Sequence, residues 1–123
     1  MLKPGGRLVV TTPNWAYVRN DLPSFAEIGE PAQHELKEFS ADADGHFFAY
    51  RASELATILE SAGLSAVSVK YFESPWISGH IKVRYLHRLL PSAPLRWLDA
   101  LTLRTPGLGE RLAHQLMLTG QAR

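Results

Sequence analysis

The sequence of 123 residues fits one compact unit or part of one, and it is too short for several domains. Hydrophobic residues make up 46% and charged residues 20%, as in soluble globular domains, which excludes a disordered tail. The absence of cysteine excludes disulfide scaffolds, thiolate zinc sites and cysteine nucleophiles. The net charge of +1 hides an uneven distribution: residues 21–60 carry nine acidic and two basic residues, whereas residues 80–123 carry seven basic and two acidic ones.

The first predicted element is a strand. A turn pattern, Lys3-Pro4-Gly5-Gly6, precedes the β-branched run Arg7–Thr12, which stops at Pro13. Because the apolar residues of this run are continuous instead of alternating, we expect both faces to be covered, as in the parallel sheet of an α/β fold. We expect Asn14 to cap a short helix that ends before Pro23.

The middle of the chain predicts a lid, a helix and a second strand. Residues 27–46 hold half of the acidic residues with weak periodicity, which favours a loop or lid with one helical turn. Residues 52–63 place Leu55, Ile58 and Leu59 on one helical stripe and end at a glycine. Residues 67–71 alternate between apolar and polar, as in a strand with one covered face.

The last third predicts a helical insertion and a final strand. Two amphipathic stretches, 79–90 and 94–103, are separated by prolines, and residues 114–119 favour a short strand. We therefore expect one partial domain, with a strand, lid, helix and strand in 1–74, an insertion in 75–110 and the final strand in 111–123. No apolar run is long enough for a signal peptide or a membrane span, so we expect a soluble, cytoplasmic protein.

Three patches of the sequence share the pattern of one enzyme family. They are Leu2–Val10 with Thr12-Pro13-Asn14, then HFFAY with a helix that ends in Ala62-Gly63-Leu64, and last QLMLTG at 115–120. Together they resemble the C-terminal half of class I S-adenosylmethionine-dependent methyltransferases of the small-molecule branch. The resemblance implies an α/β fold: a partial Rossmann-like methyltransferase sheet of the last three strands, the final one antiparallel, with a helical insertion.

The resemblance implies methyl transfer from S-adenosylmethionine to a small-molecule or lipid-like acceptor, with this chain as the substrate-side portion. The family binds the cofactor through a glycine-rich loop after its first strand and an acidic residue that ends the second, and the resemblance places both before the start of this chain. No Gly-x-Gly pattern follows a predicted strand here. We therefore expect the chain to be truncated and inactive alone. Either the native protein extends before Met1, or a complementing cofactor-binding half completes it. We also expect an exposed sheet edge, which favours a dimer. Another departure is Arg51, where the family usually has a Ser or Thr helix cap.

The candidate substrate-binding residues lie after the first strand. Ligands of open parallel sheets sit at the carboxyl ends of strands, which singles out Thr12, Pro13, Asn14 and Trp15. Asn14 would orient a substrate oxygen or nitrogen, and Trp15 would stack on the acceptor. The alternative is a helix cap and a core aromatic.

The candidate catalytic residue is His46, with Phe47 and Tyr50 as a substrate-binding aromatic wall. A neutral imidazole can take a proton from an attacking hydroxyl. The base is optional, because methyl transfer from a sulfonium depends mainly on positioning. The alternative is a surface histidine over core aromatics.

Other partners are weighed on charge and spacing. No metal site is predicted, because the five histidines include no pair four residues apart. No nucleic-acid partner is expected, since the aromatic cluster lies in the acidic part of the chain. Residues 80–104 combine apolar and basic side chains, so either they contact a membrane peripherally or they form a lid packed on the sheet. The alternative function is a non-catalytic binding or interaction module, or a partner subunit.

Overall fold

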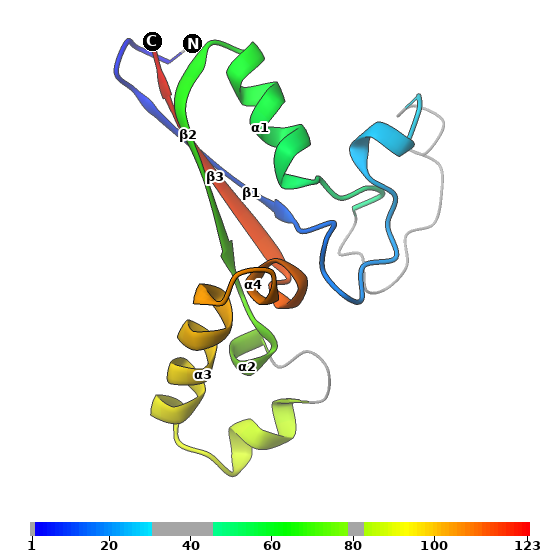
Figure 1. Ribbon diagram of the computed structural model, residues 1–123, viewed down its shortest axis with the longest axis vertical. Coiled ribbons are helices and arrows are strands. Elements are labelled where there is room, and N and C mark those ends of the chain that lie inside the picture. Colours follow the sequence, from blue (N-terminus) through cyan, green and yellow to red (C-terminus); the bar gives the residue numbers. More distant parts are fainter. Residues whose placement is uncertain (1, 31–45, 79–82) are drawn as a thin grey trace.

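The computed structural model describes residues 2–30, 46–78 and 83–123 (Figure 1). In chain order its elements are β1 (Arg7–Pro13), η1 (Phe25–Glu27), α1 (Ala52–Ser61), β2 (Leu64–Phe72), α2 (Pro75–Ser78), η3 (Val83–Arg88), α3 (Ser92–Arg104), α4 (Leu108–Leu112) and β3 (Gln115–Ala122). The fold is mixed α/β, with a small sheet and a few helices. Among the described helices, none is long and apolar enough to cross a bilayer.

The sheet has the order β1-β3-β2, with β3 antiparallel to both neighbours. At its centre Leu118 pairs with Val10 on one side and with Val69 on the other. β1 and β2 therefore run in the same direction without pairing with each other. The predicted final antiparallel strand is confirmed and extends to Ala122, and it lies between the other two strands.

The core lies between α1 and one face of the sheet (Figure 1). Leu55 and Leu59, one helical turn apart, pack with Leu64, Leu116 and Leu118. The helix predicted over 52–63 is confirmed over Ala52–Ser61, with two of its stripe residues in the core.

The opposite face of the sheet is open in the described part of the chain. Side chains of β1 alternate between half-buried and exposed, and Val9 is 56% exposed. The expectation that β1 is covered on both faces is therefore wrong for the described residues, because α1 packs only on the side of Leu8 and Val10.

The structure differs from two other local predictions. The stretch after Asn14 forms turns up to Arg19 instead of a helix, because its polar groups bond to distant parts of the chain. In the insertion, α3 confirms the helix predicted over 94–103, whereas 83–88 of the other predicted helix is a 3-10 helix. Residues 31–45 of the predicted lid and 79–82 of the insertion lie outside the described residues.

Replacing Leu118 by Ala should lower the free energy of unfolding by about 3 kcal/mol, because Leu118 has no exposed surface and the change leaves a cavity under α1. The measurement is urea denaturation. Val9→Ala is the control, because it removes an exposed apolar side chain from the same sheet, and it should cost under about 1 kcal/mol. Equal losses for the two variants would contradict the placement of the core.

Candidate functional site

An open groove of about 780 Å³ lies beyond the carboxyl end of β1. It is formed by the segment that follows β1, by η1 and by α4. Its lining residues are Trp15, Ala16, Val18, Asn20, Asp21, Leu22, Pro23, Glu27, Glu110 and Arg111. Of the residues predicted from the sequence, Trp15 lines this groove.

Asn14 connects two segments at the groove, the turn after β1 and the residues of α4 and its C-terminal end. Its side chain is 2% exposed, and its Nδ2 donates hydrogen bonds to the carbonyl oxygens of Glu110 (2.6 Å) and Ala113 (2.9 Å). Its Oδ1 accepts a bond from the main-chain N–H of Ala16 at 3.1 Å, which tightens the turn after β1. Both donor hydrogens have protein partners, so the structure gives Asn14 a positioning role in the turn after β1.

Main-chain hydrogen bonds fix the rest of the segment that follows β1. The N–H of Asn14 donates to the carbonyl of His114 at 3.0 Å, and that of Val18 donates to the carbonyl of Arg111 at 2.8 Å. On the other side, the N–H of Trp15 donates to the carbonyl of Tyr50 at 3.2 Å. The groove therefore depends on segments that are far apart in the sequence.

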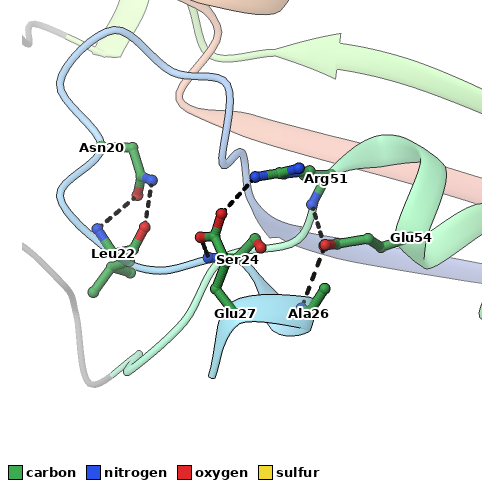
Figure 2. Close-up of polar contacts among 7 residues, drawn as sticks. All are labelled: Asn20, Leu22, Ser24, Ala26, Glu27, Arg51 and Glu54. Carbon is green, nitrogen blue, oxygen red and sulfur yellow. Dashed lines mark hydrogen bonds and ion pairs between the residues drawn. The ribbon is translucent and has the colours of Figure 1, made fainter. Parts of the chain in front are cut away.

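Arg51 joins Trp15 to an acidic side chain. Its guanidinium carbon lies 3.9 Å from the centroid of the Trp15 ring, a cation–π contact. Its Nη2 donates to Oε1 of Glu27 at 2.7 Å (Figure 2). The side chain of Glu54 accepts the main-chain N–H of Arg51 at 2.9 Å, so the start of α1 is capped although no Ser or Thr stands there.

Glu27 is the lining carboxylate with the most fixed position. Its Oε2 accepts the main-chain N–H of Ser24 at 2.9 Å (Figure 2). This hydrogen bond, together with the guanidinium of Arg51, holds the pKa of Glu27 below its usual value. The other charged lining residues are Asp21, Glu110 and Arg111, so the groove is polar with more acidic than basic groups.

The aromatic residues of the predicted wall pack together, but Phe47 and Tyr50 are not among the residues that line the groove. Tyr50 lies with its ring centroid 5.0 Å from Phe48 and 5.1 Å from Phe25, and Phe47 lies 5.2 Å from Phe48. Burial raises the pKa of the Tyr50 phenol. Parallel bridges of Tyr50 with Asn14 and of Ala49 with Ser24 hold this segment beside the groove.

The remaining predicted residues do not line the groove. His46 is exposed, and Thr12 and Pro13 are half-buried at the end of β1. The structure therefore does not place the predicted base in the lining of the groove. The sequence reasoning did not identify Glu27, Glu110 and Arg111 as site residues, and Arg51 was noted only as a departure from a helix cap. The acidic bias of residues 21–60 is the signal that pointed toward Glu27.

The described residues offer neither a metal-binding cluster nor a glycine-rich cofactor loop. Within 2–30, 46–78 and 83–123, no three His, Asp or Glu side chains gather closely enough to hold a metal ion. Gly107-Leu108-Gly109 is the glycine pair nearest to a cofactor pattern, yet a Cβ on Gly109 would lie 2.8 Å from the carbonyl oxygen of Leu103. Close packing of α4 on α3 therefore explains this glycine, and the described residues do not fit an S-adenosylmethionine cradle.

Comparisons with protein-family models, curated proteins and solved structures found no match to this chain. The methyltransferase resemblance therefore rests on the residues quoted above.

Asn14→Asp should lower the free energy of unfolding by about 3 kcal/mol. The carboxylate has nearly the same shape but cannot donate to the two carbonyl groups, which then stay unpaired in a buried place. Thermal and urea denaturation measure the loss.

The matched control is Asn20→Asp. Asn20 is half-buried and its Nδ2 donates one bond, to the carbonyl of Leu22 at 2.9 Å, so the expected loss is about 1 kcal/mol. If Asn14→Asp cost no more than the control, the bonds of Asn14 would not be what secures the groove.

The protein should lose stability as the pH falls, in part because Glu27 becomes protonated. Because its folded pKa is lowered, its contribution is complete above the ordinary value of 4.5 and is lost as the pH falls through the lower, folded pKa. Glu27→Gln should remove this part of the acid dependence. Arg51→Met should keep most of the pKa shift, because the Ser24 N–H is its largest cause. A carbon NMR titration of the carboxyl group that returned to about 4.5 in Arg51→Met would contradict this order of causes.

Proposed function

We propose that this chain is the substrate-side portion of a class I S-adenosylmethionine-dependent methyltransferase and that it binds a small-molecule acceptor in the groove beside Trp15. The observation that carries the proposal is the sheet. The resemblance implies a last strand that runs against its neighbours, and β3 runs antiparallel between β1 and β2. A Rossmann-like identity of this sheet is part of the proposal.

The position of the groove supports this function. In open sheets of this class, ligands bind beyond the carboxyl ends of the strands that run in the same direction. The groove begins at Trp15, immediately after β1 and the Asn14 turn. An acceptor bound there would lie beside the edge of the sheet where further strands would add.

The residues that line the groove suit the positioning of an acceptor better than acid–base catalysis. Methyl transfer to an oxygen, nitrogen or carbon requires the acceptor atom to be held in line with the methyl group, and correct positioning supplies most of the acceleration. The Trp15 ring, fixed by Arg51, presents a flat apolar surface to an acceptor. Asp21 and Glu110 can accept hydrogen bonds from its hydroxyl or amino groups, whereas Glu27 is already paired with Arg51.

The cofactor is assigned to residues other than those described here. No glycine-rich turn follows a described strand, and Gly109 is needed for packing. We propose that a cofactor-binding half, on the same or another polypeptide, pairs with the outer edge of β1, which has no partner strand within the described sheet.

The test is complementation. The cofactor-binding half of a well-folded class I methyltransferase is fused before Lys3, and S-adenosylmethionine binding is measured by calorimetry. The fused protein should bind the cofactor saturably, and the chain alone should not. In an acceptor screen with labelled cofactor, Trp15→Ala should reduce methyl transfer at least about tenfold and leave cofactor binding unchanged.

Ile77→Ala is the control for the acceptor site, because Ile77 is exposed on α2 and does not line the groove. It should leave both measurements unchanged. Failure of several well-folded fusions to bind the cofactor would reject the methyltransferase assignment and favour a non-catalytic binding module. Equal activity of the Trp15 and Ile77 variants would reject the groove as the acceptor site.

A further inference from the structure

The helical insertion carries an unusual concentration of exposed apolar side chains. Leu89 is 81% exposed, Trp97 64% and Leu101 50%. Tyr85, Leu86 and Leu90 are exposed beside them in the sequence. We call these six residues, together with the exposed Arg88, Arg96 and Arg104, the insertion surface. Exposed Leu and Trp side chains gathered in one region mark an interaction site more often than scattered ones do.

α3 has two distinct sides. Its inner side is fixed by Leu95, which is buried, by Asp99, which accepts a hydrogen bond from the Ser74 hydroxyl, and by Thr102, whose Oγ1 accepts the indole N–H of Trp76 at 2.9 Å. Trp97 and Leu101 lie one turn apart on the outer side. Their exposure is therefore set by the packing of the helix, and rotating α3 to bury them would break these bonds.

The charge of this region is mainly positive. Residues 75–108 contain five Lys or Arg and a single acidic residue, Asp99, whose carboxylate faces inward to Ser74. Arg88, Arg96 and Arg104 are exposed. The insertion surface thus combines apolar side chains with positive charge and no exposed acidic group within its described residues.

We propose that the insertion surface binds the surface of an anionic phospholipid bilayer. Leucine side chains enter the boundary of the acyl chains, a tryptophan ring favours the headgroup level, and arginines pair with phosphates. The shape of the molecule suits this role: α3 and the tip that precedes it lie at the end of the long axis opposite both termini (Figure 1). The tip can therefore reach a planar surface while the groove beside Trp15 stays open.

A protein partner is the competing occupant. It would cover the leucines and Trp97 but would not require a uniformly basic surround, whereas an anionic bilayer requires both. The proposal does not depend on the methyltransferase assignment, because it uses none of the groove residues.

The experiment is flotation of the full chain with extruded vesicles of phosphatidylcholine containing phosphatidylglycerol, against vesicles of phosphatidylcholine alone. Binding should require the anionic lipid and weaken at high salt. Arg96→Glu with Arg104→Glu should reduce the partition coefficient by about twenty-five-fold or more, because each basic residue near such a surface contributes about fivefold. The control is Arg7→Glu with Lys70→Glu, two exposed sheet residues with the same change in charge, and it should change binding less than about threefold.

A second pair of variants tests the apolar part. Leu89→Gln with Trp97→Gln should also abolish binding, and brominated lipid should quench the fluorescence of the wild type but that of Trp97→Phe much less. The proposal is overturned if the chain does not bind anionic vesicles at low salt, or if the insertion and sheet charge variants lose binding equally. It is also overturned if Leu89→Gln with Trp97→Gln still binds vesicles and instead converts a self-associated chain into monomers.

Discussion

The rest of the structure depends on the position of β3 between β1 and β2. Neither outer strand has another partner strand in the described sheet, so their alignment comes from β3 alone. Leu116 and Leu118 of β3 have no exposed surface and join both strands to α1 through one core. The approach is close at Gly120, where a Cβ would lie 3.2 Å from the Cβ of Leu64. A larger residue there would require Leu64 to shift by a few tenths of an ångström.

The candidate site follows from how β3 begins. α4 leads into β3, and the carbonyl groups of Glu110 in α4 and of Ala113 just after it accept hydrogen bonds from Asn14, which fixes the turn after β1. On the far wall, Arg51 at the start of α1 packs on Trp15 and pairs with Glu27. The groove therefore lies where the start of β3, the end of β1 and the start of α1 meet, and a change in the core would reach it.

The helical insertion differs from the sheet in where it places its large apolar side chains. The sheet buries its leucines against α1, whereas the insertion leaves Leu89, Trp97 and Leu101 in solvent and fixes α3 by hydrogen bonds to Ser74 and Trp76. Apolar side chains held outward by a fixed helix are available to another surface, and the basic charge around them selects its sign. The groove and the insertion surface use separate residues, so an acceptor and a lipid surface could be bound together.

The sequence by itself determined the elements whose signal is local. The leucine spacing of α1, the proline-bounded α3 and the final strand were all predictable, because helical and strand periodicity arise from residues a few positions apart. Only the tertiary structure decided which face of β1 is covered, that Asn14 starts a turn instead of a helix, and that Arg51 and Glu27 meet at Trp15 while His46 does not line the groove. These outcomes depend on hydrogen bonds and contacts between segments about 25 to 100 residues apart, and no local pattern encodes such pairings.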